Sequence, residues 1–182
     1  MTKIKICGIR DINTAVVAKD ADFMGFIMND RYRRYCQPEV VKRICKEVKG
    51  SQKVGVFVDQ PLSEVNYLAE YCGLDYVQLH GHEDESYAAH IEKPIIKAFR
   101  YGEDFSLDKA QNFPAEIILI DSYSNGMTGG TGVSFAWREA AKEICQLQKP
   151  YMIAGGISAQ TVQEAVKIFN PFGIDASGSM EK

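Results

Sequence analysis

Two side chains in the sequence have the chemistry needed to move protons. Cys7 ends a short apolar segment and is followed at once by Gly8, with Arg10 close by. A lone cysteine is usually a small buried hydrophobe, but a cation or dipole that lowers its pKa turns it into a base or a nucleophile. Asp121 ends another apolar segment. It either caps the following loop or, with its pKa raised in an apolar setting, serves as a general acid.

Glycine-rich turns suggest that the ligand carries a phosphate group. Gly155 and Gly156 precede a segment that we expect to be a helix with Ser158 as its N-cap. Glycines let the backbone approach an anion closely, and the amides at a helix N-terminus donate hydrogen bonds to it. One glycine pair alone would indicate only a tight turn, but a similar turn follows the next apolar segment. It consists of Ser177, Gly178 and Ser179, and a further glycine-rich turn spans 129–132. An acid and a base beside a phosphate site predict proton transfer on a sugar phosphate.

The other candidate site residues are polar side chains at or near the ends of apolar segments. They are Arg34, Asp59, Gln78, His80, Arg100 and Asp175. They form one site only if these segments are parallel strands whose carboxyl ends meet.

Eight short segments predict strands, because they are rich in Ile, Val, Phe and Tyr and too short for helices. They span 3–7, 22–27, 53–58, 75–80, 94–99, 116–121, 150–155 and 173–177. Seven amphipathic segments between them predict helices. These span 11–18, 38–49, 61–72, 83–91, 104–111, 134–145 and 158–169. The alternation indicates parallel β/α units, and eight strands favour a (β/α)8 TIM barrel over an open doubly wound sheet.

We expect these 182 residues to lack the eighth helix of such a barrel, since the eighth predicted strand ends at 177; we expect either that the natural protein has this helix or that a partner chain covers the gap. An apolar flank beside the first and eighth strands is therefore expected to be exposed, unless a partner chain covers it. We expect a monomer or a homodimer.

Composition excludes several classes of protein. With 182 residues, 46% hydrophobic and 25% charged, the chain is expected to form one globular domain over 1–182. Lys and Arg total 21 against 24 Asp and Glu, a net charge of −3, so no basic surface for nucleic acid or anionic membrane is expected. No apolar run approaches the roughly 20 residues of a membrane span. Five irregularly spaced cysteines and no signal-peptide pattern argue against a disulfide framework and for the cytoplasm.

Sequence blocks along essentially the whole chain resemble the phosphoribosylanthranilate isomerase family. Among them are KIKICGIR (3–10), YVQLHGHE (76–83), GGTGVSFAW (129–137), MIAGGIS (152–158) and GIDASGSME (173–181). The resemblance implies a (β/α)8 barrel of tryptophan biosynthesis that requires no cofactor or metal. Its substrate is a small phosphosugar.

The resemblance also implies a reaction and a set of roles. The reaction is the Amadori rearrangement of N-(5-phosphoribosyl)anthranilate, with Asp121 matching the general acid and Cys7 the general base. Arg34 matches an arginine beside the anthranilate carboxylate, where a planar guanidinium suits the ligand. Three residues match the lining of the substrate site, namely Gln78, His80 and Asp175. The phosphate turns are matched by Gly155, Gly156, Ser177, Gly178 and Ser179.

The sequence departs from the family pattern in two segments of the expected site, and two alternative functions remain open. Arg33 stands beside Arg34 and could bind the carboxylate instead, and the glycine of the turn at 177–179 is shifted by one place from the family pattern. One alternative is the related phosphosugar isomerase of histidine biosynthesis, which generally uses two aspartates in place of Cys7 and Asp121. The other is a barrel that binds a phosphorylated ligand without turning it over.

Overall fold

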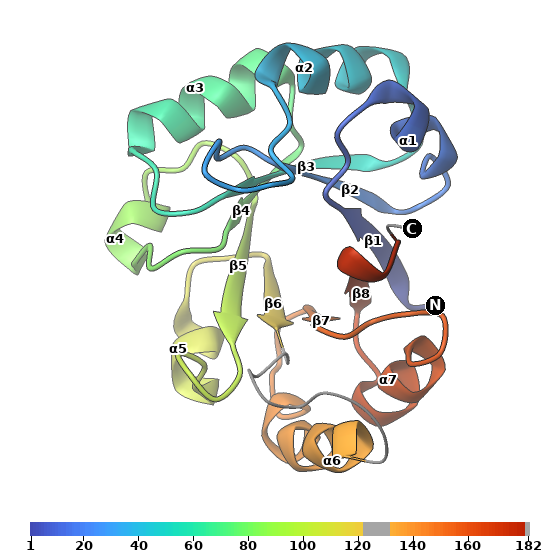
Figure 1. Ribbon diagram of the computed structural model, residues 1–182. Helices are drawn as coiled ribbons and strands as arrows, with labels where there is room; N and C mark the ends of the chain where they lie inside the picture. The colour runs from blue at the N-terminus through green and yellow to red at the C-terminus, as the bar shows by residue number, and fades with distance from the viewer. Residues whose placement is uncertain (122–131, 181–182) are drawn as a thin grey trace.

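The eight strands close into a parallel barrel. The computed structural model describes residues 1–121 and 132–180. The strands are β1 (Lys3–Cys7), β2 (Phe23–Ile27), β3 (Gln52–Phe57), β4 (Tyr76–Leu79), β5 (Ile95–Arg100), β6 (Ile117–Asp121), β7 (Tyr151–Ala154) and β8 (Gly173–Ala176). Each pairs with the next in chain order, and β8 pairs with β1 to complete the ring (Figure 1). The predicted (β/α)8 barrel is confirmed.

Seven helices surround this ring in the part of the chain that is described (Figure 1). They are α1 (Ile12–Val17), α2 (Pro38–Glu47), α3 (Leu62–Cys72), α4 (Glu85–Ala88), α5 (Leu107–Asn112), α6 (Gly132–Ile144) and α7 (Val162–Phe169). A short 3-10 helix, η1 (Gly178–Met180), follows β8. Each predicted helical segment overlaps one of the seven, although α5 ends one residue later and α6 begins two residues earlier than predicted. Gly73 ends α3, because its φ of 71° is left-handed and breaks the helical path.

The prediction that Ser158 caps the last helix is wrong. Helix α7 begins at Val162, and Thr161 is its N-cap. The backbone N–H of Ser158 donates to Oγ1 of Thr161 at 2.9 Å, and that hydroxyl donates to the carbonyl of Gly156 at 2.7 Å. These bonds hold 156–161 in a turn, so the helix starts later than its sequence pattern indicates.

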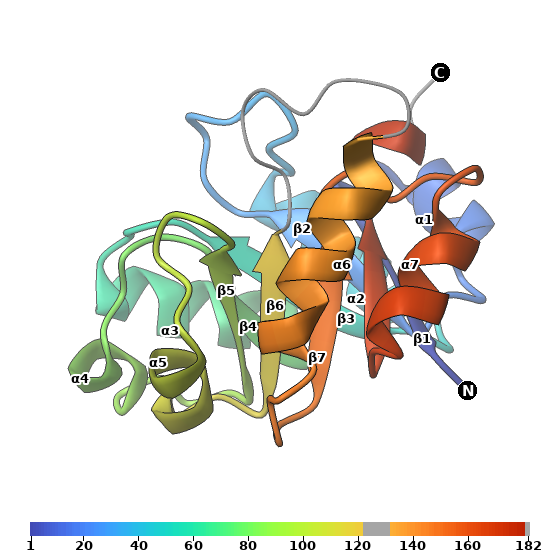
Figure 2. The same cartoon turned by 90° about the horizontal axis from the view of Figure 1, so that it is seen from below.

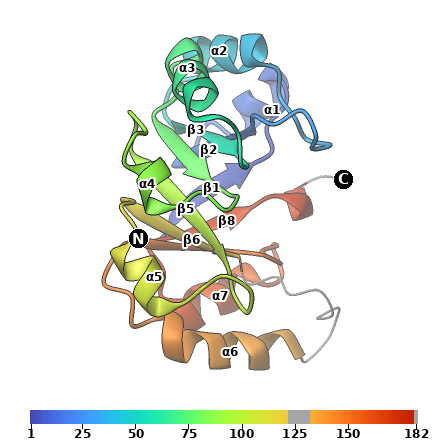
Figure 3. The same ribbon diagram turned by 90° about the vertical axis from the view of Figure 1, so that its left-hand side faces the viewer.

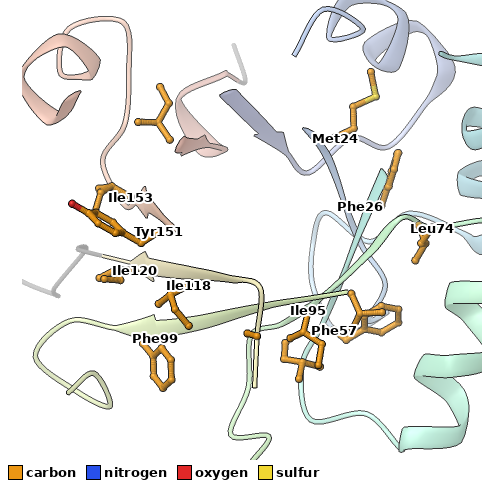
Figure 4. Close-up of a cluster of buried hydrophobic side chains, with 14 of the residues drawn as sticks. Met24, Phe26, Phe57, Leu74, Ile95, Phe99, Ile118, Ile120, Tyr151 and Ile153 are labelled. Atoms are coloured by element: carbon orange, nitrogen blue, oxygen red, sulfur yellow. The ribbon is translucent and has the colours of Figure 1, made fainter. Parts of the chain in front are cut away.

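The strands bury side chains on both faces. The inner face fills the barrel with a small apolar cluster, which consists of Phe23, Val54, Ile96, Ala98, Ile117, Leu119, Met152 and Ala154. The alternate residues of the same strands face the helices. Figure 4 shows part of this outer layer, including Met24, Phe26, Ile118 and Ile120. Burial on both faces explains why most strands lack a clean polar and apolar alternation in the sequence.

In strand β1 the apolar side chains lie on the outer side of the barrel, which is the reverse of the pattern in a strand whose outer face meets solvent. Ile4 lies on the outer side of the barrel and is 44% exposed, and Phe172, just before β8, is 38% exposed. No helix in the described ranges covers the outer side of β1 and β8 between α7 and α1 (Figure 1). The expected apolar flank beside the first and eighth strands is confirmed. No helix among the described residues is long and apolar enough to cross a membrane.

The loops that follow the strands gather at one end of the barrel. Figure 2 shows the strands in side view, with the long loop after β2 and η1 at the end opposite the N-terminus. Figure 3 shows the same arrangement from another side. Because all eight strands are parallel, residues from distant parts of the chain meet there.

Candidate active site

A pocket of about 570 Å³ opens at the carboxyl ends of the strands. Its lining includes every residue that the sequence analysis assigned as the acid, the base, a substrate contact or a phosphate contact. These are Cys7, Arg34, Gln78, His80, Asp121, Gly155, Gly156, Asp175, Ser177, Gly178 and Ser179. Asp59 and Arg100 also end strands but do not line this pocket. Asp59 instead accepts a 2.6 Å hydrogen bond from the backbone N–H of His82, and Arg100 pairs with Asp104 at 3.6 Å.

Cys7 owes its position to a missing side chain on the neighbouring strand. Its Cα is paired in register with that of Gly25 on β2. A Cβ at Gly25 would lie only 2.7 Å from Sγ of Cys7, closer than such atoms approach in proteins. The thiol therefore fills the space that a side chain on β2 would occupy.

The charges around Cys7 act on its pKa in opposite directions. Burial raises the pKa of the Cys7 thiol above its usual value. The ammonium of Lys5 and the guanidinium of Arg34 oppose that shift, whereas the carboxylate of Asp175 adds to it. A thiolate at this position depends on the nearby cations.

Lys5 is the important residue that the sequence interpretation missed. Its side chain is 0% exposed, and its ammonium donates to Oδ2 of Asp175 at 3.0 Å, across the β1–β8 pairing. The other carboxylate oxygen of Asp175, Oδ1, is buried and has no hydrogen-bond partner among the described residues. The available signal was spacing: Lys5 lies two residues before Cys7, so both side chains point into the barrel.

The loop after β2 is fixed to the end of β8. An Nη1 proton of Arg34 is donated to Oγ of Ser177, and that hydroxyl donates to the backbone carbonyl of Cys7 at 3.1 Å. A Cβ at Gly8, whose φ is 91°, would lie 3.1 Å from the Arg34 side chain. Arg33 lines an adjoining pocket of about 380 Å³, whereas Arg34 lines both. Of the two arginines, Arg34 is the one beside Cys7.

His80 is a neutral imidazole at neutral pH. Burial lowers its pKa to about 4, and the positive charges of Lys5, Arg100 and Lys97 act in the same direction. Nε2 of Gln78 lies 2.8 Å from Nδ1 of His80. The pair presents polar atoms to the pocket without adding a charge to it.

Two turns form the side of the pocket where a phosphate is expected. Gly155 and Gly156 have φ values of 81° and 69°, which a residue with a side chain adopts only with strain. The hydroxyl of Ser179 donates to the carbonyl of Ile157 at 2.5 Å and so joins the turn after β7 to the turn after β8. Residues 129–131 of the third glycine-rich turn lie outside the described residues. In the parts of the chain that are described, no cluster of His, Cys, Asp and Glu could hold a metal ion.

Comparison with known proteins identifies the family. The family model for N-(5'-phosphoribosyl)anthranilate (PRA) isomerase matches residues 4–182. The chain belongs to the PRA isomerase family. A relative of that name from Desulforamulus reducens is 38% identical over 184 aligned residues, which cover 100% of this chain and 87% of the relative.

Solved structures of PRA isomerases share the fold. The enzyme from Thermotoga maritima aligns with a TM-score of 0.87 and 30% identity, over 100% of this chain and 90% of that one. A second PRA isomerase, in complex with reduced 1-(o-carboxyphenylamino)-1-deoxyribulose 5-phosphate, aligns with a TM-score of 0.84 and 27% identity over 100% and 89%. The family consists of isomerases of tryptophan biosynthesis, so a phosphosugar isomerase is the class of enzyme to which this pocket belongs.

Proposed function

We propose that the protein converts N-(5-phosphoribosyl)anthranilate into 1-(2-carboxyphenylamino)-1-deoxyribulose 5-phosphate. The observation that carries the proposal is that one pocket holds Cys7, Asp121 and Arg34 together with the glycine turns after β7 and β8. In this proposal Cys7 is the base, Asp121 is the acid, Arg34 binds a carboxylate, and the two turns bind a phosphate. A ligand with both a carboxylate and a phosphate matches that set of groups.

The first step of the proposed reaction opens the sugar ring. The carboxyl group of Asp121 donates its proton to the furanose ring oxygen, and the bond from that oxygen to C1 breaks. The nitrogen lone pair forms a double bond to C1, which gives an iminium ion. Burial raises the pKa of Asp175, and a negative charge on Asp121, at the end of β6, adds to that shift. The two carboxyl groups therefore share one electrostatic environment in the pocket.

The second step removes a proton from C2. The iminium ion makes this proton acidic, and the Cys7 thiolate accepts it as the electron pair moves to neutralise the nitrogen. The resulting enolamine tautomerises to the ketone. No atom is gained or lost over the sequence, as an isomerisation requires.

The remaining residues bind and orient the substrate in this proposal. Arg34 forms a bidentate pair with the anthranilate carboxylate, for which its planar guanidinium is suited. Gln78, His80 and Asp175 contact the sugar, and the turns at 155–156 and 177–179 bind the phosphate. The five cysteines are free thiols in the structure, in keeping with a reducing cytoplasm. We propose a monomer or a homodimer that works without a cofactor or metal.

The decisive experiment follows the fluorescence of the anthranilate-derived substrate with purified protein. We expect a decay whose rate is proportional to protein concentration, as with a known PRA isomerase run in parallel. A Cys7→Ala sample prepared in the same way controls for contaminating host enzyme. No decay where the known isomerase works would overturn the proposal in favour of a barrel that only binds a phosphorylated ligand. Turnover of the histidine-pathway phosphosugar alone would favour that related isomerase.

A further inference from the structure

Beneath the pocket the barrel contains a buried ion pair. Lys5 and Asp175 face each other at the β1–β8 pairing, and their side chains join at 3.0 Å. The Asp175 carboxylate reaches the pocket lining, whereas Lys5 does not contribute to that lining. A buried charge is costly unless a nearby opposite charge compensates it. A lysine buried without access to substrate therefore calls for a partner within the protein.

Asp175 compensates only part of the buried positive charge of Lys5. Lys5 has a second neighbour in Cys7, which stands two residues further along the same strand and on the same inner face. Burial disfavours the ammonium, but the negative charges available to Asp175 and Cys7 outweigh it and raise the pKa of Lys5. Lys5 therefore stays charged at neutral pH, and its ammonium is shared between the Asp175 carboxylate and the Cys7 thiol.

We propose that Lys5 is a positioning residue whose ammonium, held by Asp175 below the pocket, is the internal counter-ion of the Cys7 thiolate. The proposal rests on the proposed role of Cys7 as the base of the isomerisation. Lys5 touches no substrate and acts through the sulfur atom. When Cys7 accepts the C2 proton the thiolate charge disappears, and Lys5 remains paired with Asp175.

Other charged groups lie near Lys5, Cys7 and Asp175, so the test must separate their effects from that of Lys5. Arg34 approaches Cys7 from the loop after β2 and also stabilises its thiolate. Asp121 on β6 acts on Asp175, and Lys5 acts on the imidazole of His80. The effect of Lys5 is therefore measured on the thiol of Cys7 itself, since activity alone would combine all these contributions.

The test compares Asp175→Asn with the double variant Lys5→Met, Asp175→Asn. The first removes a negative charge near the sulfur, so the pH midpoint of Cys7 alkylation should fall. The second removes the cation as well, so its midpoint should rise above that of the first by about one to three pH units. Because the double variant leaves no buried charge without a partner, it is expected to fold even if Lys5→Met alone does not.

The readout is the rate at which iodoacetamide modifies the peptide that contains Cys7, measured by mass spectrometry across pH. Peptide-level detection separates Cys7 from the exposed Cys145. The matched control is Lys97→Met, which breaks a comparably buried pair between Lys97 and Glu83 (2.9 Å) in the outer layer. That control should lower stability without moving the Cys7 midpoint. The acid limb of the pH profile of kcat/KM should follow the alkylation midpoint in each active variant.

Two results separate this inference from the proposed function. Equal alkylation midpoints in the single and double variants would overturn the role of Lys5, whatever the activity. Full activity of Cys7→Ala would instead remove the base from the proposed mechanism, and a shifted midpoint would then describe a thiol that takes no part in the reaction.

Discussion

Gln78 and His80 are joined side chain to side chain, with Nε2 of Gln78 2.8 Å from Nδ1 of His80. An amide N–H can only donate, so Nδ1 accepts and the single proton of the neutral ring lies on Nε2. Gln78 thus determines the tautomer of a histidine that burial keeps uncharged. His80 lines the pocket as a hydrogen-bond donor that adds no positive charge near Cys7.

The low pKa of His80 predicts a specific loss of stability in mild acid. The folded-state pKa is about 4 and the ordinary value is 6.5. Between these values the unfolded chain binds a proton that the folded protein does not, so stability falls as the pH decreases from 6.5 to 4. The whole shift corresponds to about 3 kcal/mol. Urea unfolding of wild type and His80→Gln across this range should show a smaller decrease in the variant. Parallel curves for the two proteins would contradict the neutral, buried state of His80.

The acid and base roles predict that Cys7→Ala and Asp121→Ala each lower kcat by about 10²- to 10⁴-fold or more, the range for a positioned proton donor or acceptor. Both variants should fold and bind inorganic phosphate nearly as well as wild type, because neither side chain belongs to the glycine turns. Steady-state fluorescence kinetics and phosphate titration measure the two properties. Cys145→Ala is the control, because that thiol is exposed at the end of α6, far from the pocket lining. Near wild-type turnover by either site variant would remove that residue from the mechanism.

Gly25 is predicted to be required for the position of the Cys7 thiol. In Gly25→Ala the new Cβ would lie 2.7 Å from Sγ and 3.2 Å from Cα of Cys7, so the thiol or the strand must move. Displacing a reacting group by an ångström can cost about 10²-fold in rate. We therefore expect a loss of kcat of about that size, measured alongside thermal unfolding.

A second strand glycine gives the matched control for that substitution. Gly55→Ala on β3 would place a Cβ against Leu74 and 2.7 Å from Phe57, in the outer layer. It should destabilise the fold by about 1–3 kcal/mol and leave kcat close to wild type. If both glycine variants lost the same fraction of activity, the effect would be one of stability and not of thiol position.

The barrel could be predicted from the sequence because its signals are local. Short β-branched segments and amphipathic segments alternate, and each strand lies close to its predicted range. Ser158 shows where local signals fail. Its place in the sequence resembles an N-cap, but its backbone N–H donates to the Thr161 hydroxyl, and the helix begins only at Val162. Competition between two nearby hydroxyl groups is not visible in periodicity.

The residues that line the candidate site were predictable from the sequence, but the lysine beneath them was not. Cys7, Asp121 and the glycine turns stand at strand ends, where the barrel places chemistry. Lys5 was missed because lysines alternating with isoleucines are typical of a strand with one exposed face. Its burial depends on Asp175, which lies 170 residues further along the chain. Only closure of β8 against β1 brings the two charges together.

Arg34 is predicted to bind the substrate carboxylate, in preference to its neighbour Arg33. Arg34→Lys keeps the charge but loses the planar guanidinium that bonds Ser177, so the KM for the phosphoribosylanthranilate should rise about tenfold or more. Arg33→Lys should change KM far less, because Arg33 lines the adjoining pocket. Kinetics of both variants, with product inhibition as a second measure of affinity, test the assignment. A larger effect at Arg33 would exchange the roles of the two arginines.

The turn after β7 is predicted to bind phosphate through its backbone conformation. Gly156→Ala meets no heavy atom within 4 Å, so its cost comes from the φ of 69° alone, about 1 kcal/mol. A turn that relaxes to avoid this strain moves its amides away from the anion, so affinity for inorganic phosphate should fall about tenfold. Gly102→Ala is the matched control, with a φ of 86° and no heavy atom within 4 Å, in the loop after β5 and outside the pocket lining. Both variants should lose similar stability in urea, but only Gly156→Ala should lose phosphate affinity in calorimetric titration. Equal affinity in the two variants would place the phosphate at the turn after β8 alone, where Ser177 and Ser179 supply the donors.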